Sequence, residues 1–305
     1  MVIIGSRLSN FVERESMEAT NSMPNFAVLQ LSGCSGCEVS LLNANEWVDK
    51  YKLLYMPLVI TTKKIPDEIE TLIITGGVRN EEDEYNLRKA AALAKRVVAV
   101  GTCAISGGVS NLGDRDKVRQ LFNQDLKRHN LPTLLPKSHP VDKFIEVDLY
   151  LPGCPPTPEL FMAALTSPED FKPGLIVCAE CGRKKLGDMK PKHLTGFQTN
   201  VDQPDICLVN QGFLCVGTST RGGCRALCTR PGHPCVGCRG PSDILIEKES
   251  GAWFESIKRT FNRMTEIPEE ELDAALKSPQ LSLFLFQFAD YEGADIKPRN
   301  KNKVL

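Results

Sequence analysis

Two cysteines, Cys34 and Cys37, stand three residues apart in the stretch LSGCSGCEVSLLN, residues 31–43. An apolar run over residues 26–31 predicts a strand ahead of them, and the residues after them favour a helix. The glycines beside both cysteines let the backbone turn sharply, and the start of a helix favours negatively charged thiolates. The pair fits part of a metal cluster, a redox dithiol, half of a zinc site or two core cysteines.

Two further cysteines follow predicted strands in the same way. The apolar run 97–100 is typical of a buried parallel strand and leads into Cys103, and the alternating run 144–151 leads into Cys154. The carboxyl ends of parallel strands meet at one edge of a sheet, where ligands collect. The sequence therefore predicts one cluster whose four ligands come from distant parts of the chain: Cys34, Cys37, Cys103 and Cys154.

The segments that must position these thiols alternate between strand and helix patterns. Further strands are expected over residues 53–60, where Pro57 suggests a sheet edge, and over 71–74. Helices are expected from Asn80 to a basic last turn at Lys95 and Arg96, from the spacing of Val118, Leu121, Phe122 and Leu126, and from Thr157 onward. This order predicts an α/β fold with an open parallel sheet and helices on both faces.

The chain is expected to divide into an arm over residues 1–24, a sheet domain over 25–168 and a second domain over 169–305. The second domain is rich in glycine and proline, with a short helix expected over 269–277 and a basic, polar tail. It is expected to have little apolar core, so metal ligation would supply much of its folding energy. It holds the other eight cysteines: Cys178, Cys181, Cys207, Cys215, Cys224, Cys228, Cys235 and Cys238.

The composition of the 305 residues excludes several classes of protein. Twelve cysteines are too sparse for a disulfide scaffold, and a net charge of -1 gives no overall attraction to nucleic acid. No run approaches the roughly 18 apolar residues of a membrane span, and no signal-peptide core or twin-arginine pair is seen near the start. We therefore expect a cytoplasmic protein with reduced thiols.

The eight C-terminal cysteines make two more sets of four, with none left over. Sets of four thiolates suit either zinc or iron-sulfur clusters. Zinc ribbons usually pair two CxxC motifs, whereas the ligands here are widely scattered, which favours the larger cluster. Zinc stays open as an alternative at this point.

Four motifs together resemble one family, the small, electron-transferring subunit of nickel-iron hydrogenases. They are SGCSGCEVSLLN (32–43), GTCAISGGV (101–109), LPGCPPTPE (151–159) and PGHPCVGC (231–238). The resemblance implies a flavodoxin-like sheet domain followed by an irregular iron-sulfur domain. It also implies that electrons from H2 oxidation in a separate large subunit pass through three 4Fe-4S clusters.

The resemblance implies a proximal cluster on Cys34, Cys37, Cys103 and Cys154. The medial set becomes Cys224, Cys228, Cys235 and Cys238, and Cys228 adds a fourth ligand where many members have three cysteines. The distal set becomes Cys178, Cys181, Cys207 and Cys215, with Cys178 in the place of a common histidine ligand. Gly36 and Gly108 stand where oxygen-tolerant members have extra cysteines, which implies an oxygen-sensitive site.

This combination looks most like the methyl-viologen-reducing, deazaflavin-non-reducing hydrogenases of methanogens. The implied partners are the nickel-iron large subunit, an iron-sulfur adaptor subunit and, beyond it, heterodisulfide reductase, with no nucleic acid and no membrane span. One alternative is a quinone-reductase-type iron-sulfur subunit, against which the eight-cysteine domain argues. The other is a zinc-stabilised binding module, which would be colourless.

Several charged residues near the cysteines have simpler explanations. Glu38 could carry protons near a catalytic partner, but a glutamate at a helix start needs no such role. His233 is expected to donate a hydrogen bond beside the medial cysteines rather than bind metal. A basic run could steer an acidic electron partner or form a solvated face: Arg183, Lys184, Lys185, Lys190 and Lys192.

Overall fold

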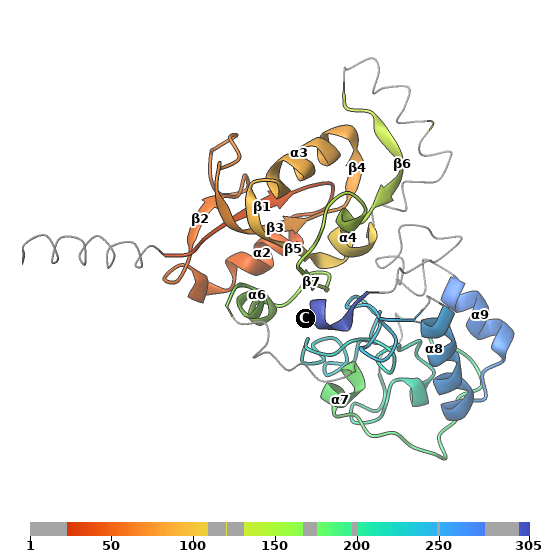
Figure 1. Ribbon diagram of the computed structural model, residues 1–305. Coiled ribbons are helices and arrows are strands. Elements are labelled where there is room, and N and C mark those ends of the chain that lie inside the picture. The colour runs from red at the N-terminus through yellow and green to blue at the C-terminus, as the bar shows by residue number, and fades with distance from the viewer. Residues whose placement is uncertain are drawn as a thin grey trace, which may run out of the picture.

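The computed structural model describes residues 23–108, 120, 131–166, 176–196, 201–248, 251–277 and 299–305. A sheet-containing part comes first in the chain, and a part built from loops and short helices follows it (Figure 1). The helix expected from Val118, Leu121, Phe122 and Leu126 lies outside the described residues, as does nearly all of the expected arm.

A five-stranded sheet in the order β2-β1-β3-β5-β7 forms the centre of the first part. Each neighbouring pair is parallel. Counted along the chain the order is 2-1-3-4-5, which is that of flavodoxin-like folds. The expected α/β class and flavodoxin-like sheet are therefore confirmed. The strands are β1 (Asn25–Gln30), β2 (Lys52–Tyr55), β3 (Ile69–Thr75), β5 (Ala94–Val100) and β7 (Leu149–Leu151).

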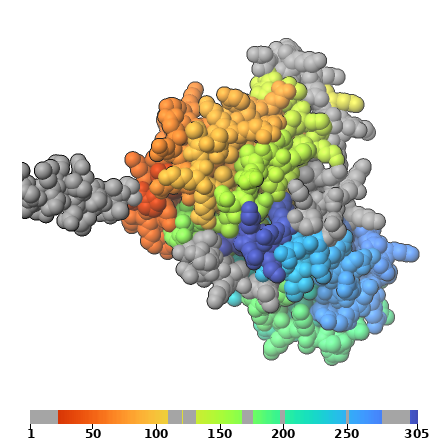
Figure 2. Space-filling model, in the orientation of Figure 1, coloured from red at the N-terminus to blue at the C-terminus, as the bar shows by residue number. Residues whose placement is uncertain are grey.

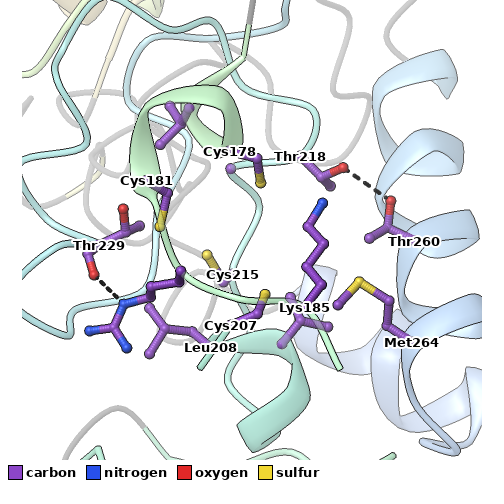
Figure 3. A pocket seen from close by; sticks show the side chains of 14 residues that line it. Cys178, Cys181, Lys185, Cys207, Leu208, Cys215, Thr218, Thr229, Thr260 and Met264 are labelled. Atoms are coloured by element: carbon purple, nitrogen blue, oxygen red, sulfur yellow. Dashed lines mark hydrogen bonds between the residues drawn. The ribbon is translucent and has the colours of Figure 1, made fainter. Parts of the chain in front are cut away.

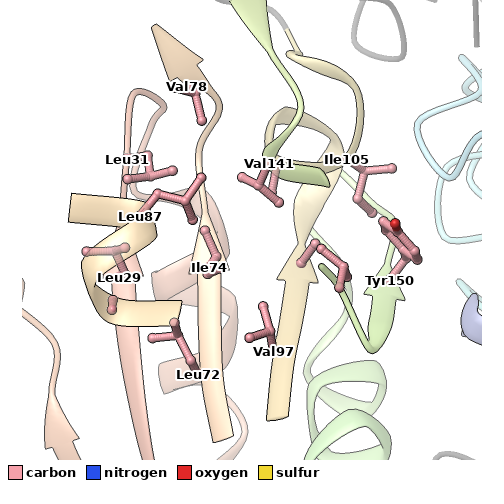
Figure 4. Close-up of a cluster of buried hydrophobic side chains, with 14 of the residues drawn as sticks. Leu29, Leu31, Leu72, Ile74, Val78, Leu87, Val97, Ile105, Val141 and Tyr150 are labelled. Atoms are coloured by element: carbon pink, nitrogen blue, oxygen red, sulfur yellow. The ribbon is translucent and has the colours of Figure 1, made fainter. Parts of the chain in front are cut away.

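Helices cover both faces of the sheet because both faces are apolar. Successive residues of a strand point to opposite faces, so Phe26 and Val28 pack with helices α2 (Gly36–Leu42) and α6 (Pro158–Leu165). Ala27 and Leu29 pack on the other side, with α3 (Glu81–Ala91) and α4 (Gly101–Ser106) (Figure 4). A single 3-10 turn, η1 (Asn45–Trp47), follows α2.

Helix α3 begins as the sequence predicts and ends earlier. The Asp83 N–H donates to Asn80 Oδ1 at 2.8 Å, and Asp83 Oδ2 accepts from the Asn80 N–H in return. The expected basic last turn at Lys95 and Arg96 is wrong, because both residues belong to β5. Arg96 pairs with Thr71 of β3, so pairing within the sheet places these residues in a strand and the helix ends before them.

Other differences from expectation also come from pairing between distant segments. Strand β4 (Val78–Asn80) pairs antiparallel with β6 (Leu134–His139). The two form a small separate sheet that no local sequence pattern predicts. Strand β2 ends before Pro57 and lies at the sheet edge, as Pro57 suggested. Strand β7 is shorter than expected, because only Leu149–Leu151 pair with β5. A 3-10 turn, η3 (Val141–Lys143), lies ahead of it.

The second part has an apolar core of its own, so the expectation that it has little apolar core is wrong. Helix α8 (Gly251–Met264), which was not expected from the sequence, buries Trp253 and Phe261. The expected helix is present as α9 (Glu269–Lys277) and buries Leu272 against them. The other elements are α7 (Val177–Cys181) and the turn η5 (Val209–Gln211).

Residues 299–305 lie along the edge of the sheet rather than forming a polar tail. After the turn η7 (Lys301–Lys303), Val304 forms a parallel bridge with Tyr150 of β7, and the Leu305 N–H donates to Tyr150 O at 3.0 Å. Val304 and Leu305 are buried, which corrects the expected polar tail. Figure 2 shows this dark blue segment at the junction of the two parts.

A buried arginine links the sheet part to the second part. The Arg239 guanidinium donates to Gly222 O at 2.8 Å, to Pro152 O at 2.6 Å and to Leu305 O at 2.8 Å. Burial, and then the charge of Arg221, lower its pKa to about 10. None of the described helices has the length and apolar composition that a bilayer crossing requires.

Candidate metal centres

Four thiols meet at the carboxyl edge of the sheet. Cys34 lies in the loop after β1, Cys37 in the first turn of α2, Cys103 in α4 directly after β5, and Cys154 in the loop after β7. Burial raises the pKa of Cys37 well above its usual value, and the charges of Glu38 and of the other three thiols add to the shift. The structure thus brings together the residues of the predicted proximal set.

Glycines leave room for these sulfur atoms. Gly101 has a φ of +82°, and a Cβ there would lie 2.5 Å from Cys37 Sγ. Gly108 has a φ of +64°, and a Cβ there would overlap Cys103 Sγ. A Cβ on Gly36 would lie 3.4 Å from Cys34 Sγ. The two positions at which the resemblance places extra cysteines in oxygen-tolerant members, Gly36 and Gly108, therefore both border thiols of this group.

The loops that carry these thiols are fixed to one another by hydrogen bonds. The buried carboxylate of Glu38 accepts from Thr75 Oγ1 at the end of β3. Ser40 Oγ donates to Pro156 O at 2.5 Å, which joins α2 to the loop of Cys154. The other carboxylate oxygen, Glu38 Oε2, is buried without a hydrogen-bond partner among the described residues.

A second group of thiols lies in the loop from Cys224 to Cys238. Burial and then the charge of Cys224 raise the pKa of Cys228, while burial raises that of Cys238 to about 11. Arg225 and Ala226 have φ values of 55° and 54°, a region that non-glycine residues rarely adopt, so the loop is held in an unusual shape. His233 Nδ1 lies 2.8 Å from Pro234 O, within hydrogen-bonding distance.

A third group lines a cavity next to α8. Helix α7 presents Cys178 and Cys181 one turn apart, and the backbone of Lys184 pairs with that of Cys207, whose N–H donates to Lys184 O at 2.7 Å. Cys215 completes the set (Figure 3). Burial raises the pKa of Cys215 to about 12, against the opposing effect of the Gly217 and Cys235 N–H groups.

Backbone N–H groups connect the three groups of thiols in series. The Cys154 N–H donates to Cys238 Sγ, between the first and second groups. The Cys235 N–H donates to Cys215 Sγ at 3.3 Å, between the second and third. Thr102 Oγ1 also donates to Cys238 O at 2.9 Å.

The donor chemistry fits iron-sulfur clusters. All twelve cysteines are free of disulfide bonds, and thiols bind metal as deprotonated thiolates. Among the described residues, no three His, Cys, Asp or Glu side chains are close enough to share one metal ion. The thiolates of a 4Fe-4S cluster bind different iron atoms, so they stand further apart.

Two residues of this region were not expected from the sequence. Gly101 borders Cys37, and its place directly before Thr102 and Cys103 was the available signal, since a glycine at a strand end often marks close approach of another group. Arg239 directly follows Cys238, but nothing in the local sequence indicates that its guanidinium is buried between two parts of the chain.

Comparisons with known proteins place these motifs in context. A family model described as "NADH ubiquinone oxidoreductase, 20 Kd subunit" matches residues 34–167. The chain is 36% identical over 244 residues to a vhu-type F420-non-reducing hydrogenase subunit of Methanocaldococcus jannaschii, covering 74% of this chain and 84% of that protein. It is 30% identical over 261 residues to the F420-non-reducing hydrogenase iron-sulfur subunit of Archaeoglobus profundus, covering 70% and 81%. The actinobacterial-type NiFe-hydrogenase from Ralstonia eutropha H16 aligns with a TM-score of 0.47 and 16% identity, over 84% of this chain and 87% of that one.

Proposed function

Because this chain belongs to the same family as these F420-non-reducing hydrogenase subunits and is thus a hydrogenase subunit, we propose that it is the electron-transfer subunit of a nickel-iron hydrogenase. In this proposal H2 is oxidised in a separate large subunit. This chain then conducts the electrons through three clusters to an iron-sulfur adaptor subunit and on to heterodisulfide reductase, in the cytoplasm.

The proposed proximal 4Fe-4S cluster is held by Cys34, Cys37, Cys103 and Cys154. The proposed medial 4Fe-4S cluster is held by Cys224, Cys228, Cys235 and Cys238, and the distal one by Cys178, Cys181, Cys207 and Cys215. When bound, such clusters supply one-electron redox centres. Each group of four thiols is assembled from residues that lie near one another in the structure, which supports this partition.

The observation that carries the proposal is the pair of hydrogen bonds between neighbouring groups. The backbone N–H of Cys154 donates to the Cys238 thiol and that of Cys235 to the Cys215 thiol, so the backbone at each group contacts a thiol of the next group. Neither of these two hydrogen bonds joins the first group to the third. A linear order, proximal to medial to distal, is the order that such contacts support.

The exposure of the strand-end thiols supports a partner at that edge. Cys34 and Cys154 are exposed in the isolated chain, whereas clusters of this kind are ordinarily shielded from solvent. Val39 on α2, two residues after Cys37, is 50% exposed. A large subunit that covered this edge would bury these residues and bring its nickel-iron site near the proximal cluster.

A quinone-reductase-type subunit is the second candidate, since the matching family model carries the name of an NADH ubiquinone oxidoreductase subunit. That model covers only residues 34–167, which contain none of the eight C-terminal cysteines. A zinc-stabilised module would bind its metal without colour.

One experiment separates these candidates. The hydrogenase complex is purified without oxygen, and iron, acid-labile sulfide and zinc are measured per chain. We expect a brown protein with about twelve iron atoms and about twelve sulfides in this subunit, from three 4Fe-4S clusters. Iron for only one cluster would favour the quinone-reductase type, and stoichiometric zinc would favour the zinc module.

A further inference from the structure

Two basic side chains line the cavity that contains Cys178, Cys181, Cys207 and Cys215. They belong to Arg183 and Lys185. In Figure 3 the Lys185 side chain extends from the side of Cys207 toward Cys178 and Thr218. Its charge acts on the Cys178 thiol, whose pKa burial raises to about 11 and Lys185 lowers.

Arg183 is engaged in holding the loops of the cavity together. Its Nε donates to Thr229 O at 2.6 Å, its Nη1 to Ile206 O at 3.0 Å and its Nη2 to Arg230 O at 3.2 Å. These bonds join α7 to the loops around Cys207 and Cys228. The guanidinium of Arg183 is therefore hydrogen-bonded to backbone carbonyls around the thiols.

The ammonium of Lys185, unlike the guanidinium of Arg183, makes no hydrogen bond to the backbone of the described residues. Within the described part of the chain, no carboxylate or carbonyl accepts a hydrogen bond from its ammonium, so its charge has no protein counter-ion there. Lys185 instead lines the same cavity as the four thiols, which become negatively charged thiolates when they bind a cluster. A cluster bound by four thiolates carries a net negative charge, which grows by one unit when the cluster accepts an electron.

We propose that Lys185 sets the reduction potential of the distal cluster, by stabilising its reduced state with a fixed positive charge beside Cys178. This inference rests on the proposed function, since it requires a cluster on these four cysteines. One electron enters from the medial cluster and one leaves to the acceptor, and no proton has to accompany it. Lys185 thereby keeps the exit end of the relay easier to reduce.

The effect of Lys185 is moderate, because the residue is exposed and water screens its charge. Replacing it by a neutral side chain is expected to lower the equilibrium constant for reduction about tenfold, a shift of about 59 mV for one electron. A conservative replacement by arginine retains the charge, so it is expected to retain most of the potential.

The neighbouring residue provides a matched control. Lys184 carries the same charge and is also exposed, but its side chain does not line the cavity. Its backbone bridges to Ile206, and successive residues of such an extended pair point to opposite sides. Lys184→Gln therefore removes one positive charge from the same segment without removing it from the cavity.

The test is a redox titration of the complete hydrogenase complex, followed by electron paramagnetic resonance, for the wild type, Lys185→Gln, Lys185→Met, Lys185→Arg and Lys184→Gln. Iron and sulfide are measured in each. We expect the distal potential to fall in both neutral Lys185 variants, and to stay near the wild-type value in Lys185→Arg and Lys184→Gln.

Each other outcome has a defined meaning. An unchanged potential in the neutral variants, or an equal fall in Lys184→Gln, overturns the role of Lys185. Loss of the distal cluster in both neutral variants also overturns it, since Lys185 would then be needed for binding the cluster. A wild-type complex that lacks a third cluster contradicts the proposed function itself.

Discussion

At the scale of single residues, the medial loop offers the clearest test of ligand number. Cys228 is exposed, and its carbonyl accepts the His233 N–H at 2.9 Å, which folds the loop back toward Cys235. Cys228→Ala removes one thiolate and is expected to yield a three-iron cluster in place of a 4Fe-4S cluster. Electron paramagnetic resonance of the oxidised variant would detect this change, and an unchanged spectrum with unchanged iron content would exclude Cys228 as a ligand.

Gly101 provides a test of the proximal site. In Gly101→Ala the new methyl group would lie 2.5 Å from Cys37 Sγ, and the φ of +82° disfavours alanine by about 1–2 kcal/mol. We expect the variant to lose the proximal cluster, seen as a loss of about four iron atoms per chain. Gly187→Ala is the control, because a Cβ there meets nothing within 4 Å. Equal iron content in both variants would contradict the prediction.

The residues around the thiols were predictable to different degrees. Cys103 and Cys154 could be placed at strand ends because an apolar run followed by glycine is a local signal. The approach of Gly101 to Cys37 and of Lys185 to Cys178 could not, since each depends on how two segments of the chain come together in space. Such contacts follow from the fold and have no local pattern.

At the scale of elements, helix α8 carries much of the core of the second part. Phe261 is 0% exposed and packs with Trp253 and Leu272. Phe261→Ala is expected to destabilise this part by about 3–5 kcal/mol, through lost burial and the cavity that remains. Thermal unfolding of the anaerobic complex measures the effect, with exposed Asn262→Ala as control on the same helix. Equal melting temperatures of the two variants would show that the core does not support this part.

The elements were predictable where their signals are local. Asn80 followed by four acidic residues predicts the start of α3 from its capping chemistry alone. The spacing of Trp253, Ile257, Phe261 and Met264 is also typical of a helix, so α8 has a local signal, although a glycine- and proline-rich segment precedes it in the sequence. The β4–β6 pair joins residues more than fifty positions apart, which no local pattern encodes.

At the scale of the whole molecule, Arg239 joins segments from three parts of the chain. Arg239→Met would leave the carbonyls of Pro152, Gly222 and Leu305 without this donor in a buried place. Each such loss costs about 1–3 kcal/mol. We expect a lower melting temperature. We also expect the electron paramagnetic resonance signal of the reduced medial cluster to grow more slowly after H2 is added. Exposed Arg230→Met, which bonds only to Glu180 O among the described contacts of its side chain, is the comparison. Identical behaviour of the two variants would contradict a linking role.

The exposed carboxyl edge of the sheet leads to a prediction about assembly. We expect the large subunit to cover Cys34, Cys154 and Val39 through an interface above roughly 2,000 Å², the size of permanent assemblies. Val39→Asp should then weaken copurification of the two subunits, whereas Val59→Asp, at an equally exposed position, should not. Purification of this chain alone as a stable monomer with all its clusters would contradict the expectation.

The pairing of Val304 with Tyr150 also bears on the order in which contacts form during folding. The two residues are more than 150 positions apart in the sequence, so their pairing closes a long loop of the chain. Contacts of such long range form late in folding. Until Leu305 is in place, Arg239 lacks one of its three carbonyl acceptors. The contacts of residues 299–305 with β7 and Arg239 are therefore expected to form late, so the two parts of the chain become fixed to each other only after each has folded.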